Sequence, residues 1–139
     1  MDKTISITDI AGPKFVFIHI VSPHPPFTCN ENGKFRMGSN LTHAWWEPRE
    51  DYLNQLKYVN SSIQKFILRA LENKAEPVVL LQSDHGPWMQ DTDEQNIYEA
   101  RSRILNAYYL PQQYGNPFYN SITPVNSFRV LFYTLFNDS

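Results

Sequence analysis

Apolar runs typical of β-strands alternate with helical segments along this chain, and this alternation constrains the fold more than any other feature. The expected strands cover residues 14–21, 77–82 and 103–110, and the expected helices cover residues 48–74, 94–102 and a last segment that begins at Thr123. Such an order is typical of parallel βαβ units with right-handed crossovers. We therefore expect an α/β fold with a mainly parallel sheet flanked by helices.

The first of these runs, residues 14–21, is almost continuously apolar, as in strands that are buried on both faces of a parallel sheet. Three strands are few for such a sheet, so at least one long hydrophobic edge would need a cover. Another part of a larger domain or another chain could supply that cover.

The two longer helices have apolar residues at three- and four-residue steps, as expected for helices with one face in a core. In the helix over residues 48–74 this stripe consists of Tyr52, Leu56, Val59, Ile63, Phe66, Ile67, Ala70 and Leu71. The last helix is expected to use Thr123 as its N-cap and Pro124 as its first residue. Its predicted apolar face consists of Val125, Phe128, Leu131, Phe132 and Leu135.

The composition is that of an ordinary globular domain of 139 residues, with 42% hydrophobic and 19% charged residues. A formal net charge of -2 argues against non-specific nucleic-acid binding, which needs a basic surface. The apolar runs are too short to span a bilayer as a helix, and the first residues lack the pattern of a signal peptide. Cys29 is the only cysteine, so an intrachain disulfide is impossible, and no base lies near it in the sequence. We expect Cys29 to be unreactive.

The candidate site begins with Ser83-Asp84-His85-Gly86, which directly follows the strand expected at residues 77–82. In open α/β sheets this is where ligands bind. A carboxylate oxygen and an imidazole nitrogen together suit Zn²⁺, Mn²⁺ or a related divalent ion. The alternative is structural: Asp84 caps a turn and His85 is a half-buried histidine. Gly86 would allow a sharp turn or a close backbone approach.

His24 is the second candidate, because Pro23, Pro25 and Pro26 surround it and restrict the backbone that carries its ring. A histidine held in this way could donate to a phosphate or sulfate oxygen or protonate a leaving group. A proline-rich turn with a surface histidine is the alternative.

Other polar residues have weaker claims. His19 lies within the first expected strand and is predicted to be a core histidine. His43, in a long loop, could face a substrate or simply pack with its aromatic neighbours. Arg101 and Arg103 could pair with an anionic substrate or be solvated charges near a helix end.

Five stretches in this order resemble the sulfatase-like branch of the alkaline phosphatase superfamily, which includes sulfatases, lipoteichoic acid synthases and phosphoethanolamine transferases. The stretches are residues 14–20, 22–27, 83–86, 103–111 and 122–129. The last two resemble a bacterial subgroup of membrane-anchored proteins. The resemblance implies that the chain, residues 1–139, is one domain that forms the carboxyl-terminal portion of a larger sulfatase-like domain.

The resemblance also implies roles for individual residues. Asp84 and His85 would be ligands of a divalent metal ion (Mn, Zn, Mg or Ca), and His24 would contact the transferred phosphoryl or sulfuryl group of an ester substrate. The family's nucleophile and a further acidic ligand belong to a region that is earlier in family order. We therefore expect little or no turnover from this chain alone.

A non-catalytic remnant that acts by association is the alternative, and its exposed sheet edge could form a homo-oligomer. The resemblance points to an extracytoplasmic domain of a membrane protein, although the sequence contains no segment that would direct it there.

Overall fold

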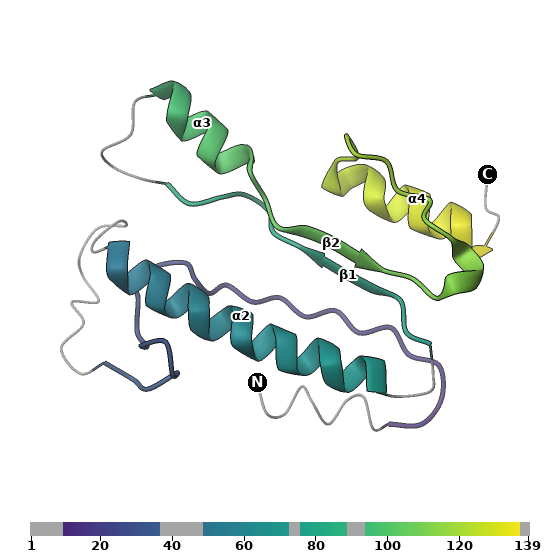
Figure 1. Ribbon diagram of the computed structural model, residues 1–139, viewed down its shortest axis with the longest axis horizontal. Helices are drawn as coiled ribbons and strands as arrows, with labels where there is room; N and C mark the ends of the chain where they lie inside the picture. Colours follow the sequence, from purple (N-terminus) through teal and green to yellow (C-terminus); the bar gives the residue numbers. More distant parts are fainter. Residues whose placement is uncertain (1–9, 37–48, 73–75, 89–93, 137–139) are drawn as a thin grey trace. The chain divides into compact units, whose positions relative to one another are not determined.

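A computed structural model describes residues 10–36, 49–72, 76–88 and 94–136 of the chain (Figure 1). Its elements are α2 (Arg49–Glu72), β1 (Val79–Gln82), α3 (Glu94–Ser102), β2 (Asn106–Tyr109), the 3₁₀ turn η2 (Gln112–Tyr114) and α4 (Pro124–Phe136). The three helices lie where the sequence predicts them. The chain divides after Glu72 into two compact units, each of which is described by itself. Among the described residues, none of the helices is both long and apolar enough to cross a membrane.

Helix α2 organises the first unit through the predicted apolar stripe. Every member of the stripe is buried or half-buried, and Val59 is only 5% exposed. Glu50 and Asp51 lie in the first turn, where negative charge interacts favourably with the helix dipole. The same face also buries Gln55, a polar residue that the stripe prediction omitted.

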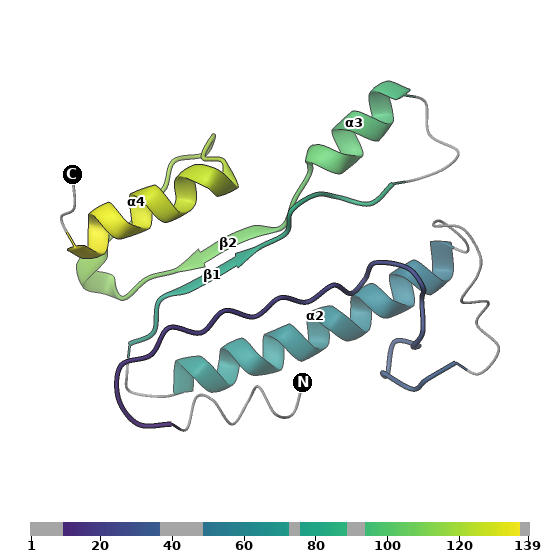
Figure 2. The same ribbon diagram turned by 180° about the vertical axis from the view of Figure 1, so that it is seen from behind.

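Residues 14–21 run alongside α2 in both views but do not form the predicted strand (Figures 1 and 2). Phe15 and Phe17 are 79% and 76% exposed, whereas the intervening Val16 is about half as exposed, at 38%. The segment therefore has strand-like alternation with one face uncovered. The prediction of burial on both faces is wrong, because no described strand pairs with this segment and nothing described covers its outer face.

A short hairpin follows, built on an antiparallel bridge between Cys29 and Phe35. The Asn30 side-chain oxygen accepts the N–H groups of Asn32 and Lys34, which closes its turn. Gly33 is needed there for two reasons: its φ is +77°, and a Cβ atom would collide with the ring of Tyr58 on α2.

The second unit contains a two-stranded sheet in which β1 and β2 are antiparallel, with Val79 opposite Tyr109 and Gln82 opposite Asn106. The α/β class agrees with these elements, but the parallel βαβ arrangement that we expected for these two strands is wrong. The reason lies in the connection, which reverses the chain. Beyond Gln82, the Ser83 N–H donates to the Leu105 carbonyl at 2.9 Å, so the pairing continues into the connection that carries α3.

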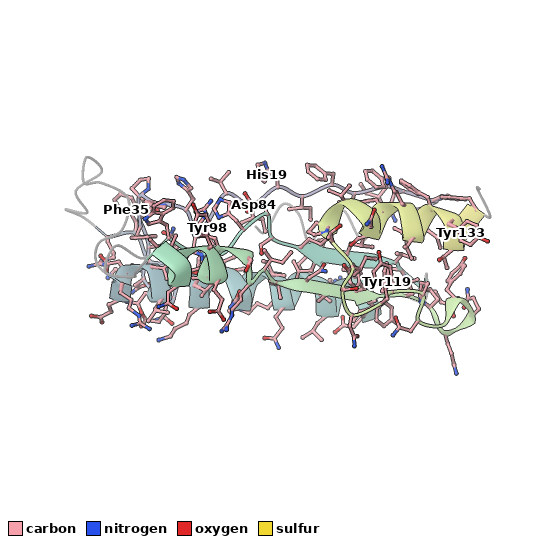
Figure 3. All side chains as sticks on the ribbon, turned by 90° about the horizontal axis from the view of Figure 1, so that it is seen from above. His19, Phe35, Asp84, Tyr98, Tyr119 and Tyr133 are labelled. Carbon is pink, nitrogen blue, oxygen red and sulfur yellow. The ribbon has the colours of Figure 1, made fainter. Side chains whose placement is uncertain are left out.

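Helix α4 starts at Pro124 as predicted, and the Thr123 carbonyl accepts the N–H groups of Asn126 and Ser127. Its buried residues are Ser127 and Leu131, whereas Val125, Phe128 and Phe132 of the predicted apolar face are exposed. Figure 3 shows Tyr133 on the same helix among the exposed aromatic side chains. Hydrogen bonding explains the difference, because Ser127 is bonded to Gln82 and Tyr108 of the sheet.

Candidate functional site

The turn Ser83-Asp84-His85-Gly86 is fastened at both ends. At its start, the Ser83 N–H donates to the Leu105 carbonyl, and the Leu105 N–H donates to Ser83 Oγ, each at 2.9 Å. At its end, the Gly86 N–H donates to the Arg101 carbonyl of α3 at 2.8 Å. A Cβ atom at Gly86 would collide with the Ala100 carbonyl, so glycine permits a close approach to a helix. Asp84 and His85 are therefore held between two fixed points.

The Asp84 carboxylate lies at the surface, with 86% of its side chain exposed (Figure 3). Its Oδ1 atom accepts the His85 N–H at 2.9 Å, which is the turn-capping role of the structural alternative. Its Oδ2 atom lies 3.5 Å from His85 Nε2. One carboxylate oxygen thus orders the turn while the other faces the imidazole.

The His85 ring is oriented by its other nitrogen, because Nδ1 lies 2.8 Å from the Gly86 carbonyl oxygen. A carbonyl can only accept, so Nδ1 carries the proton and, in the neutral ring, Nε2 carries the lone pair. A bond of this kind is what orients histidines that bind metal ions.

The two donor atoms fit one cation. Two ligands at about 2.0–2.1 Å from a tetrahedral Zn²⁺ lie roughly 3.4 Å apart, close to the observed 3.5 Å between Asp84 Oδ2 and His85 Nε2. Over the residues that the structure describes, no group of three or more His, Cys, Asp or Glu side chains gathers as a metal site would require. The pair therefore has the atom types and the spacing that two ligands of one cation would need.

His24 belongs to the first unit and is exposed. Its N–H donates to the Val21 carbonyl at 2.9 Å, and its Nδ1 lies 2.6 Å from the Pro25 carbonyl oxygen. By the same reasoning as for His85, Nδ1 is the protonated nitrogen, and Nε2 is the basic one. The two candidate histidines, one in each unit, therefore make the same kind of Nδ1 contact.

A surface cavity of about 520 Å³, more open than enclosed, adjoins His24 within the first unit. Val21, Pro26 and Phe35 give it an apolar wall, and Gln55, Thr28 and Tyr58 give it polar groups. Mixed lining of this kind is typical of sites for small organic ligands. Gln55 is the residue that sequence reasoning missed here, and its position between Tyr52 and Val59 in the apolar stripe was the available signal.

The remaining candidates have structural contacts. His19 is exposed and lies beside Phe17, with ring centroids 6.4 Å apart, so the prediction of a core histidine is wrong. The uncovered outer face of residues 14–21 explains this. The Arg101 guanidinium lies 5.3 Å from the centre of the Trp88 ring, and Arg103 pairs with Glu99 one helical turn away. His43 lies outside the described residues.

Cys29 is half-buried, and its thiol lies 3.6 Å from Gln55 Oε1. Burial raises the pKa of the Cys29 thiol above its ordinary value of 9.0. A thiol that resists ionisation is a poor nucleophile, which agrees with the expectation that Cys29 is unreactive.

These features define an α/β protein with an Asp-His pair just beyond the end of a strand. Comparison with models of known protein families shows which family the chain belongs to. The family model described as Sulfatase matches residues 1–125, so the chain belongs to the sulfatase family and to the alkaline phosphatase superfamily. Neither a search of curated proteins nor a search of solved structures yielded a match.

Proposed function

We propose that this chain supplies part of the active site of a metal-dependent enzyme that hydrolyses or transfers a phosphate or sulfate ester. The carrying observation is the 3.5 Å spacing of Asp84 Oδ2 and His85 Nε2, together with the Gly86 carbonyl that orients the His85 ring. Asp84 and His85 are the residues that hold the divalent cation. When bound, such an ion acts as a Lewis acid toward an ester oxygen.

His24 contacts the transferred phosphoryl or sulfuryl group in this proposal. Its Nδ1 is committed to the Pro25 carbonyl, so Nε2 is the nitrogen that meets the anion. When protonated, Nε2 donates a charge-assisted hydrogen bond to an ester oxygen, which is stronger than a neutral one. The adjoining cavity has room for the organic part of the ester.

Within the family, residues 103–111 and 122–129 favour bacterial membrane-anchored proteins of the sulfatase or lipoteichoic acid synthase type. A mainly parallel sheet then belongs to the complete domain, in which residues 14–21 are covered on the face that carries Phe15 and Phe17. The exposure of both rings supports this arrangement.

Metal binding by the Asp84-His85 pair is tested by titrating the 139-residue chain with Zn²⁺ and with Mn²⁺ in a calorimeter. We expect binding of one ion, weakened by more than about tenfold in Asp84→Asn and in His85→Gln, because loss of a group that merely orients a ligand already costs about that much. The matched control is His19→Gln, since His19 is exposed and lies in the other unit. Equal affinity in the wild type and the two site variants would contradict the proposal.

We further propose that the 139-residue chain has little turnover by itself, because the resemblance assigns the nucleophile to none of its residues. The assay is hydrolysis of p-nitrophenyl phosphate and p-nitrophenyl sulfate with added Mn²⁺ or Zn²⁺. Turnover at the rate of an ordinary enzyme that disappears in His85→Ala would show that the chain carries a complete site.

A non-catalytic association module is the second candidate, and the exposed apolar side chains of residues 14–21 favour it. In that case residues 14–21 pair with a second copy of the chain. Solution mass by light scattering decides between the candidates. A metal-free dimer that dissociates in Phe17→Lys supports the module, whereas a monomer that binds metal supports the enzyme.

A further inference from the structure

The loop that carries His24 has few means of holding itself in place. Pro23, Pro25 and Pro26 have no backbone N–H group, so His24 supplies the one N–H donor of these four residues. That donor is used in the turn with the Val21 carbonyl. Contacts from another part of the molecule add an anchor to this turn.

Gln55 of α2 provides this anchor with both ends of its amide. Its Nε2 donates to the His24 carbonyl at 3.3 Å, and its Oε1 accepts the Thr28 N–H at 2.8 Å. A carbonyl can only accept and an N–H can only donate, so these partners allow one orientation of the amide. The side chain is 3% exposed, which strengthens both bonds relative to bonds in water.

Packing on the same face of α2 supports the anchor. Phe27, between the two bonded residues, is buried against Tyr52 in an edge-to-face contact with ring centroids 6.0 Å apart. Tyr52, Gln55 and Val59 share one face of the helix, at spacings of three and four residues. The loop is therefore held by α2 on both sides of Pro25 and Pro26.

We infer that Gln55 is a positioning residue that aims the His24 ring, an inference that rests on the role proposed for His24. The bond from His24 Nδ1 to the Pro25 carbonyl crosses a single peptide unit, so it depends on the direction of the His24 carbonyl. Gln55 holds that carbonyl. Gln55 thereby fixes the His24 tautomer and directs Nε2 toward the ligand.

The test is nuclear magnetic resonance of the imidazole nitrogens in the full chain, with Gln55→Met and Gln55→Glu as variants. Gln55→Met removes both bonds, whereas Gln55→Glu in its ionised form keeps an acceptor for the Thr28 N–H and presents a second acceptor oxygen to the His24 carbonyl. Gln64→Met is the matched control, because Gln64 is an exposed glutamine of the same helix. His85 is the internal control, because it makes the same Nδ1 bond in the other unit.

In the wild type we expect His24 to be the Nδ1–H tautomer and to respond to added inorganic phosphate. Both Gln55 variants should mix the His24 tautomers and weaken the phosphate response about fivefold, the worth of one hydrogen bond. The Thr28 amide signal should move in Gln55→Met and stay nearly unchanged in Gln55→Glu. The His85 tautomer should be the same in all variants.

An unchanged His24 tautomer in both Gln55 variants, with the fold intact by the His85 signals, would overturn the inference. If Gln55→Met alone loses the native signals of both His24 and His85, that variant is unfolded. The His24 tautomer in Gln55→Glu then decides, and an unchanged tautomer there overturns the inference. A wild-type His24 that ignores phosphate but mixes its tautomers in both variants would support positioning and contradict the anion contact. The positioning role of Gln55 and the anion contact of His24 can therefore be contradicted independently of each other.

Discussion

A buried polar network joins the sheet to α4, and removal of its central hydroxyl gives a sharp test of how the second unit is held together. Ser127 is completely buried. Its Oγ lies 2.8 Å from Gln82 Nε2, 2.6 Å from the Tyr108 hydroxyl and 3.1 Å from the Thr123 carbonyl. Because Ser127 donates its one proton to Thr123, Tyr108 donates to Ser127. The substitution Ser127→Ala therefore leaves the Tyr108 hydroxyl without its acceptor.

The loss of stability expected for Ser127→Ala depends on which polar groups around Ser127 keep a hydrogen-bond partner. Gln82 retains Asn106, at 2.8 Å, and the Thr123 carbonyl retains two backbone N–H groups. A partly buried donor that loses its acceptor costs about 1–3 kcal/mol, so we expect Ser127→Ala to lower the free energy of unfolding by about 2 kcal/mol. Tyr108→Phe removes the donor instead and should cost about 1 kcal/mol.

Urea unfolding followed by circular dichroism measures these costs. With a urea dependence of about 2 kcal/mol per M, Ser127→Ala should move the midpoint down by about 1 M. The control is Ser121→Ala, an exposed serine of the same unit, which should change stability by less than about 0.5 kcal/mol.

A double-mutant cycle isolates the bond itself. The variant that combines Tyr108→Phe with Ser127→Ala contains no orphaned hydroxyl, so its cost should be about 1 kcal/mol smaller than the sum of the single costs. Additive costs within about 0.3 kcal/mol, or a Ser127→Ala midpoint equal to that of Ser121→Ala, would refute the network argument.

Two further predictions concern the site turn and the cysteine. Gly86→Ala should destabilise the second unit by about 1–3 kcal/mol, because the new methyl group meets the Ala100 carbonyl; the check is a urea melt together with exchange of the Gly86 N–H, and an unchanged midpoint would contradict it. Cys29 should react with iodoacetamide at pH 8 more slowly in the folded chain than in urea, because burial raises its thiol pKa. The stability that this raised pKa contributes is fully present below about pH 9 and is lost as pH rises through the folded value. Equal alkylation rates in the folded and unfolded chain would show that the thiol is not protected.

Local sequence rules predicted the elements that depend on local interactions. The stripe of α2, the start of α4 at Pro124 and the extent of α3 could all be read from spacing and capping residues, because helices form hydrogen bonds within a few residues. The site turn was predictable for a similar reason: an apolar run followed by Asp84 and His85 places both residues at a strand end.

Pairing and burial could not be predicted in the same way. An apolar run such as residues 14–21 satisfies the strand pattern, but a strand exists only where a neighbour accepts its hydrogen bonds. The direction of the β1–β2 pair depended on how the connection through α3 reverses the chain. The face of α4 was misjudged because hydropathy favours Phe128 and Phe132, whereas two hydrogen-bond partners, Gln82 and Tyr108, hold Ser127 against the sheet.

By itself, the sequence determined the family and the chemical groups of the candidate residues: a carboxylate, two imidazoles and prolines around one of them. Tertiary structure alone decided that Nδ1 of each histidine faces the carbonyl oxygen of the next residue. It also decided that Gln55, a residue with no catalytic pattern in its sequence, holds the loop of His24. Hydrogen bonds between residues 27 and 31 positions apart in the chain arise only when folding brings a helix and a loop together.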